Sequence, residues 1–74
     1  MVSNFYNTFN NTMNIQVITE QPYSEVTLTY KNSLTAPIVQ TTDGDGSTFF
    51  NNVSGSNTIT TNDKIISTIT EIVE

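Results

Sequence analysis

The sequence has no cysteine, no histidine and no tryptophan among its 74 residues. No disulfide can therefore staple this small chain, and the usual cysteine and histidine ligands of structural zinc are missing. The same absences remove the thiol nucleophile and the commonest general base of enzymes. We expect a protein that is not an enzyme, with no catalytic residue and no cofactor-binding residue.

Positive charge is also scarce. Lys31 and Lys64 are the two cations, and seven carboxylates give the chain a net charge of −5. A nucleic-acid-binding surface needs several Lys or Arg side chains to displace phosphate counterions, and anionic membranes attract proteins through the same residues. We therefore expect no nucleic acid and no membrane surface as a partner.

Membrane-spanning and targeting segments are not evident in the sequence. No apolar run approaches the roughly 20 residues of a membrane helix, so we expect no membrane insertion. The residues from Met1 to Tyr6 lack the basic and apolar regions of a signal peptide. An extracellular fibre or a virion then requires another route, such as cell lysis, and a cytoplasmic location stays open.

Apolar residues are too few for a large core. They make up 35% of the chain, and three glycines bring this to roughly 39%, against about 45–50% in typical domains. A chain of this length also buries only about 60% of its unfolded surface. Because disulfides and zinc are excluded, we expect the chain to gain stability by assembling with copies of itself.

Uncharged polar residues take the place of charge. Thr, Asn and Ser together account for 31 of the 74 residues. Thr favours strands, whereas Asn and Ser favour turns. This composition predicts an all-β fold: a small antiparallel sandwich or barrel of five or six short strands. We place one β domain at residues 13–74, preceded by an extended N-terminal arm at residues 1–12.

Alternation marks the clearest strands. One predicted strand has Met13, Ile15, Val17 and Thr19 on one face and Asn14, Gln16 and Ile18 on the other. In the segment 24–31, Val26, Leu28 and Tyr30 point one way and polar residues point the other. Such a pattern indicates strands with one buried face.

Turn residues divide the second half of the chain. The run Asp43-Gly44-Asp45-Gly46 predicts a hairpin turn between strands at 38–41 and 47–51, and residues 54–57 predict another turn. The predicted sheet core consists of Val26, Leu28, Tyr30, Ile38, Phe49, Val53, Ile59 and Ile69.

The segment 63–73 allows two structures. On a helix capped by Asn62 or Asp63, its apolar residues would share one face. Its Ile, Thr and Val content favours a strand, because β-branched side chains are stiff. We prefer the strand, which would bury Ile65, Ile69 and Val73 and leave Ile66 and Ile72 on the other face.

Three aromatic residues lie in the predicted arm, at Phe5, Tyr6 and Phe9. A frayed terminus is the default for a chain end. The alternative is an arm whose aromatic side chains dock on a neighbouring subunit and add a strand to its sheet. On this second hypothesis, Phe5, Tyr6 and Phe9 form the subunit interface.

Asp43 and Asp45 are the best metal-ligand candidates in the sequence. Their Asp-Gly-Asp-Gly run resembles part of a calcium-binding EF-hand loop, in which carboxylates alternate along the chain. Thr41 and Asn52 occupy the positions of the first Asp and the final Glu of that loop. The run is therefore interpreted mainly as an exposed turn, with weak Ca²⁺ binding at Asp43 and Asp45 as the alternative.

The spacing of strands and turns is similar to that of small jelly-roll subunits of bacterial surface fibres and spore appendages. The similarity lies in residues 26–33, Phe49-Phe50 and residues 55–60. It implies a jelly-roll-like fold and an N-terminal arm that couples successive subunits. The arms of those families often use cysteines for the coupling, which this chain lacks.

These observations lead to two functional hypotheses. The first is a self-assembling structural subunit of an extracellular fibre or of a virion, such as a phage capsid accessory, decoration or tail protein. Its partners would be copies of itself and other structural proteins. The second is a small acidic binding module, an inhibitor or adaptor, whose charge steers it to a basic protein partner.

Overall fold

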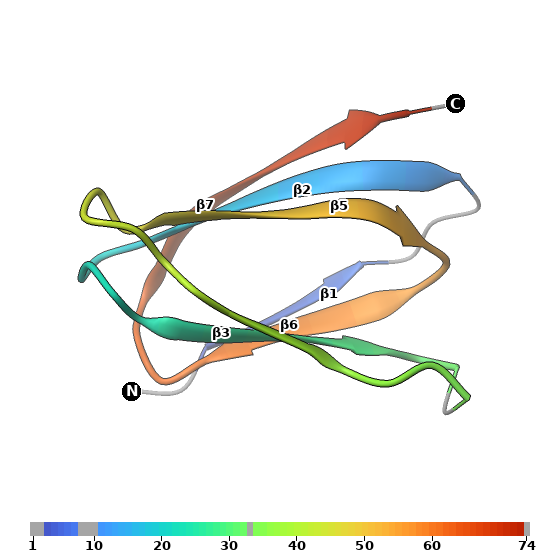
Figure 1. Cartoon of the computed structure of the whole chain (residues 1–74), viewed down its shortest axis with the longest axis horizontal. Coiled ribbons are helices and arrows are strands. Elements are labelled where there is room, and N and C mark those ends of the chain that lie inside the picture. The colour runs from blue at the N-terminus through green and yellow to red at the C-terminus, as the bar shows by residue number, and fades with distance from the viewer. Residues whose placement is uncertain (1–2, 8–10, 33, 74) are drawn as a thin grey trace.

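The computed structural model describes residues 3–7, 11–32 and 34–73, which form seven strands and no helix (Figure 1). The strands are β1 (Ser3–Asn7), β2 (Thr12–Thr19), β3 (Glu25–Tyr30), β4 (Ile38–Thr41), β5 (Ser47–Ser54), β6 (Asn57–Thr61) and β7 (Ile65–Ile72). The predicted all-β class is confirmed. The expected count of five or six strands is too low, and the C-terminal helix alternative is wrong.

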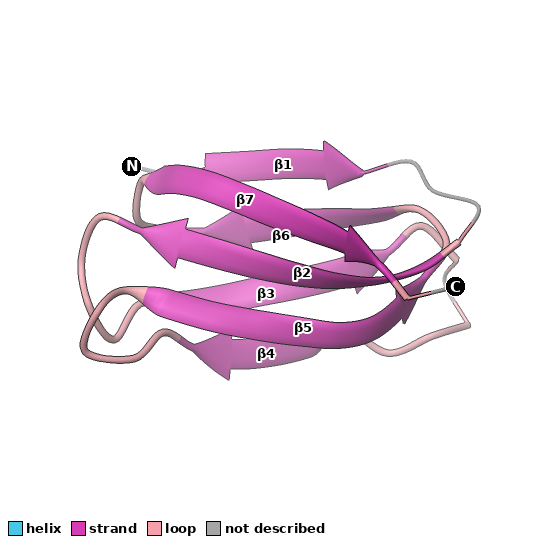
Figure 2. Cartoon of the chain, turned by 90° about the horizontal axis from the view of Figure 1, so that it is seen from above, coloured by secondary structure: helices cyan, strands magenta, loops and turns pink. Residues whose placement is uncertain are grey.

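The strands form two antiparallel sheets that face each other. One has the order β1-β6-β3-β4 and the other the order β5-β2-β7, and they do not close into a barrel. Figure 2 shows β1 and β7 along one side of the molecule and β4 and β5 along the other. The barrel alternative is therefore wrong, and each sheet keeps two free edges.

Successive strands mostly alternate between the two sheets. Only β3 and β4 are both consecutive and paired with each other. The turn at residues 43–46 therefore leads from one sheet to the other, because β4 pairs with β3 and β5 pairs with β2. The turn itself was predicted correctly, but the prediction that it closes a hairpin is wrong.

The core lies between the sheets and follows the predicted alternation of β2. Met13, Ile15, Val17 and Thr19 are all buried, and the residues between them are partly exposed. The inner faces of β3, β5 and β6 complete the layer. The buried hydrophobic residues are Met13, Ile15, Val17, Val26, Leu28, Phe50, Val53 and Ile59, with Tyr30, Ile38 and Ile65 packed against them.

Two predicted core residues lie outside. Phe49 and Ile69 both oppose Gln16 of β2, which points to the outer face, and each is 54% exposed. Phe50 instead opposes Ile15 and is buried. Adjacent aromatic residues give no alternation of their own, so only the register with β2 determines which of them faces inwards.

The face assignment along β7 was also wrong in part. A register shift next to Ile18 and Thr19 pairs Thr19 with Ile65 and Ile18 with Ser67, so Ile66 is an extra residue. Such a bulge reverses the alternation that follows it. Ile65 is therefore partly buried, as expected, whereas Ile69 points outwards and Val73 is exposed.

Part of the predicted arm belongs to the chain's own sheet. Residues 3–7 form β1, which pairs with β6 from Ser3 opposite Thr61 to Asn7 opposite Asn57. The amide of Asn7 donates a hydrogen bond of 2.9 Å to Oδ1 of Asn57, and both side chains are buried. This contact anchors the end of β1. Phe9 lies outside the described residues.

Threonine hydroxyls join strands at the margins of the core. Thr48 donates to Oε1 of Gln40 at 2.7 Å and joins β5 to β4 across the layers. Thr61 donates to the carbonyl of Glu25. Among the described residues, every buried side-chain nitrogen or oxygen has a hydrogen-bond partner. The polar composition is therefore compatible with a compact interior.

Gly46 is required by the crossing between the sheets. Its φ is +78°, and a Cβ there would lie 2.5 Å from the carbonyl oxygen of Thr19. The carbonyl oxygen of Gly46 accepts two hydrogen bonds from Thr19, one from its amide and one from its hydroxyl. Gly55 has a similar φ of +83°, but a Cβ there would meet no atom within 4 Å.

We predict that Gly46→Ala destabilises the protein much more than Gly55→Ala. The left-handed conformation should cost about 1–2 kcal/mol in both variants. The Cβ contact with Thr19 should add about 1–3 kcal/mol at Gly46 alone. Urea unfolding followed by circular dichroism measures both values. Equal losses in the two variants would contradict the close approach at Gly46.

Candidate functional site

Exposed hydrophobic side chains are concentrated at the sheet edges. The described residues include ten large hydrophobic side chains that are exposed, against eight hydrophobic residues that are buried. Seven of the ten lie on β1, β4, β5 and β7, the four edge strands. The exposed residues on those strands are Phe5, Tyr6, Val39, Phe49, Ile66, Ile69 and Ile72. The inner strands β2, β3 and β6 contribute none of the ten.

The outer face of the three-stranded sheet carries one apolar row. Phe49, Gln16 and Ile69 lie side by side on β5, β2 and β7. Gln16 donates a hydrogen bond of 2.9 Å to the hydroxyl of Ser47 on β5. A shallow groove of about 280 Å³ runs over this row.

The predicted interface residues Phe5 and Tyr6 point to opposite faces of β1. Phe5 opposes buried Ile59, and Tyr6 opposes Thr58 on the outer face. Phe5 and Ile66 line a groove of about 370 Å³ between β1 and β7. One flat surface therefore cannot cover both aromatic side chains, and a neighbour touching both must reach around the edge of β1.

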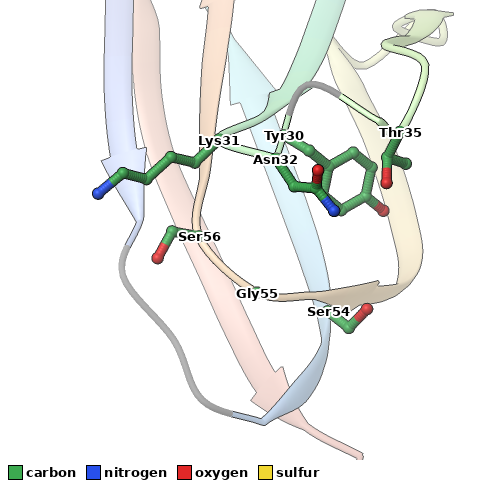
Figure 3. Close-up of a pocket in the computed structure, with 7 residues that line it drawn as sticks. All are labelled: Tyr30, Lys31, Asn32, Thr35, Ser54, Gly55 and Ser56. Atoms are coloured by element: carbon green, nitrogen blue, oxygen red, sulfur yellow. The ribbon is translucent and has the colours of Figure 1, made fainter.

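A hollow lies at the end of the molecule where the β3–β4 and β5–β6 connections meet (Figure 3). Its volume is about 560 Å³. It is lined by Tyr30, Lys31, Asn32, Thr35, Ser54, Gly55 and Ser56. In Figure 3 the Lys31 side chain extends away from Tyr30 and Asn32. The described residues of the lining offer hydroxyls, an amide and one cation, and none of them is a carboxylate.

The candidate calcium ligands form a self-contained turn. Oδ1 of Asp43 accepts hydrogen bonds from the amides of Asp45 and Ser47, at 2.9 and 3.0 Å. One carboxylate oxygen of Asp43 is thus already engaged in shaping the turn. The described residues contain no group of three or more acidic side chains that could hold a metal ion. Binding of Ca²⁺ by Asp43 and Asp45 stays a prediction.

Five of the seven carboxylates belong to the same end of the molecule. The strands β2, β4 and β6 finish at this end, and β3, β5 and β7 begin there (Figure 1). The carboxylates come from connections or strand starts that are distant in the sequence. They are Glu20, Glu25, Asp43, Asp45 and Asp63. We call these five residues the acidic end.

Asp63 connects two crossings between the sheets. Its Oδ2 accepts hydrogen bonds from the Gln21 amide at 2.7 Å and the Ser24 hydroxyl at 2.9 Å. Its Oδ1 accepts one from the Lys64 amide at 2.7 Å. The bond from Gln21 and the bonds from Lys64 and Ser24 lower the pKa of Asp63 below its ordinary value, against a smaller opposing effect of desolvation.

We predict that Asp63→Asn lowers the stability of the protein at neutral pH and that the stability of this variant falls less as the pH is lowered. Because the folded-state pKa of Asp63 is lowered, its stabilising effect is present above the unfolded pKa of 3.8 and is lost as pH falls through the folded value. Urea midpoints of the two proteins should therefore converge as the pH falls below 3.8 and through the lowered folded-state pKa of Asp63. Asp45→Asn, at an exposed turn position, is the control. A constant difference at all pH values would contradict the assignment.

No family model, curated protein or solved structure matches this chain in the comparisons with known proteins. In the parts that the structure describes, there is also no helix long and apolar enough to cross a membrane. The interpretation of the site therefore depends on its own geometry.

Sequence reasoning missed the apolar edge of β7. The isoleucines of this segment were noticed, but Ile69 was assigned to the core. The absence of lysine and proline from the eight residues of β7 was an available signal. Edge strands are usually protected by such residues, but the sequence does not reveal which strand is an edge.

Proposed function

We propose that this protein is a structural subunit that assembles with copies of itself through the free edges of its sheets. The observation that carries the proposal is the concentration of exposed hydrophobic side chains on all four edge strands. An edge strand presents unpaired N–H and C=O groups, and apolar side chains beside them favour the addition of another strand.

The proposal includes a location and a fold description. We assign the subunit to an extracellular fibre or a virion, as a capsid accessory, decoration or tail protein, without a bound cofactor. Two facing antiparallel sheets support a jelly-roll-like sandwich. In this proposal Phe5 and Tyr6 contact a neighbour at the edge of β1, and Phe9 lies close by in the sequence.

The proposal is tested by the mass in solution. We expect light scattering to give a species of at least twice 8.2 kDa that dissociates on dilution, with ordered assemblies visible by negative stain. A particle of 8.2 kDa at all concentrations, with a cooperative melt unchanged on dilution, would overturn the proposal.

The contribution of β1 is tested by Tyr6→Ser. Deletion of residues 1–12 is unsuitable, because it removes β1 and leaves the Asn57 amide without Asn7. Tyr6 is 75% exposed, so its truncation should leave folding intact while reducing assembly at a given concentration. Tyr23→Ser is the matched control, since Tyr23 is 71% exposed but lies outside the strands. If both variants assemble equally well, Tyr6 does not contribute to the interface.

The acidic end supports a second candidate function. Five carboxylates around one end would steer the protein to a basic partner as an inhibitor or adaptor. Association with a basic protein should then weaken with added salt and with the double change Asp43→Asn and Asp45→Asn. Binding that is unaffected by both would exclude this role for the acidic end.

A further inference from the structure

The free edge of β7 has little of the protection that usually prevents strand addition, namely one charged residue, Glu71, and the bulge at Ile66 near its start. This eight-residue strand contains six β-branched residues and no lysine, proline or glycine. It is an edge of the three-stranded sheet, and Ile66, Ile69 and Ile72 on it are exposed. Long, apolar edge strands with so little protection pair readily with other strands.

One hydrogen bond shows which backbone groups of β7 point to the free edge. The amide of Val73 donates to the carbonyl of Thr12 at 2.9 Å, in register with Ile72 opposite Met13. Hydrogen bonding alternates along an antiparallel strand. After the bulge, the odd-numbered residues therefore direct their backbone N–H and C=O groups to β2. Thr68, Thr70 and Ile72 direct theirs to the free edge.

We propose that β7 pairs antiparallel with β7 of a second copy, about a two-fold axis at Ile69. Thr68 of each copy then opposes Thr70 of the other, and these two pairs exchange backbone hydrogen bonds. This inference rests on the proposed function and identifies how one of the four free edges, that of β7, is used. The pairing joins the two three-stranded sheets into one six-stranded sheet.

The side chains favour this register. On the outer face Ile69 meets its own copy, and Glu71 lies opposite Ser67. Ile72 lies beside the bulged Ile66. A register centred on Glu71 would instead place two carboxylates directly opposite each other, which is destabilising. The chosen register thus covers exposed isoleucines and keeps the charges apart.

The distribution of charge also favours a second copy in this orientation. A two-fold axis across β7 directs the acidic ends of the two copies in opposite directions. The molecule is 30 Å long, so these ends lie well beyond the Debye length of about 10 Å at 0.1 M salt. Contacts through the acidic ends themselves would instead bring ten carboxylates together.

The second half of β7 is accessible to a partner strand. The groove shared with β1 involves the first half of β7, up to Thr68. Figure 1 shows β7 rising from the four-stranded layer towards its C-terminal end. Thr70, Glu71 and Ile72 are all exposed, although Thr70 and Ile72 oppose the buried residues Ile15 and Met13.

Single cysteines test the pairing in the full chain. Directly opposed residues at a non-hydrogen-bonded position have Cα atoms about 4.5 Å apart, within the range for a disulfide. Under mild oxidation at micromolar concentration, Ile69→Cys should form covalent dimers more than about tenfold faster than Phe49→Cys. Phe49 is the matched control because it has the same 54% exposure on the same face. Equal cross-linking rates would overturn the proposed axis.

Proline variants give an independent measurement. Thr70→Pro removes an N–H from the free edge but none from the ladder with β2, so the fold should survive. Thr41→Pro is the matched control, because the register places the Thr41 amide on the free edge of β4. Light scattering should show loss of the β7-linked dimer for Thr70→Pro, whereas Thr41→Pro should keep at least the mass of that dimer.

The outcomes separate this inference from the proposed function. If the wild type assembles but Thr70→Pro assembles equally well, another surface is used and β7 pairing is wrong. If the wild type is an 8.2 kDa monomer at every concentration, the self-assembly proposal itself fails.

Discussion

The antiparallel pairing of β2 with both β5 and β7 is the constraint on which the rest of the structure depends. Buried and partly exposed residues alternate strictly along β2. Through the register, a residue of β5 or β7 that opposes a buried residue of β2 points to the same face of the sheet as that residue. This places Phe50 in the core and leaves Phe49 and Ile69 on the surface. The apolar outer row is therefore a consequence of the same pairing that builds the core.

A chain with few apolar residues compensates with hydrogen bonds at the margins of its core. The paired amides of Asn7 and Asn57 and the hydroxyl of Thr61 link strands that are distant in the sequence, and the hydroxyl of Thr48 links β5 to β4 across the two layers. Such groups stabilise the fold only when both hydrogen-bond partners are present. If one partner is lost, the other stays buried without a hydrogen bond and lowers the stability of the fold. The small core and its polar margin consequently depend on a single arrangement of the strands.

Charge and apolar surface are separated in this molecule. The acidic end collects five carboxylates, whereas the edge of β7 carries exposed isoleucines and one carboxylate, Glu71. Repulsion would keep acidic ends apart, and the strand edges offer backbone hydrogen bonds and apolar contacts. This separation is the physical basis of the proposed assembly, in which copies associate along their sides.

The sequence by itself determined the all-β class, the faces of β2 and the turn at Asp43–Gly46, because alternation and turn chemistry are local properties. It also placed Asp43 and Asp45 in an exposed turn and Tyr6 outside the core. Only the tertiary structure decided that this turn crosses between sheets, that β7 is an edge, and that a bulge turns Ile69 outwards. Those features depend on which strands pair and in which register, and pairing between distant segments leaves no mark in either segment alone.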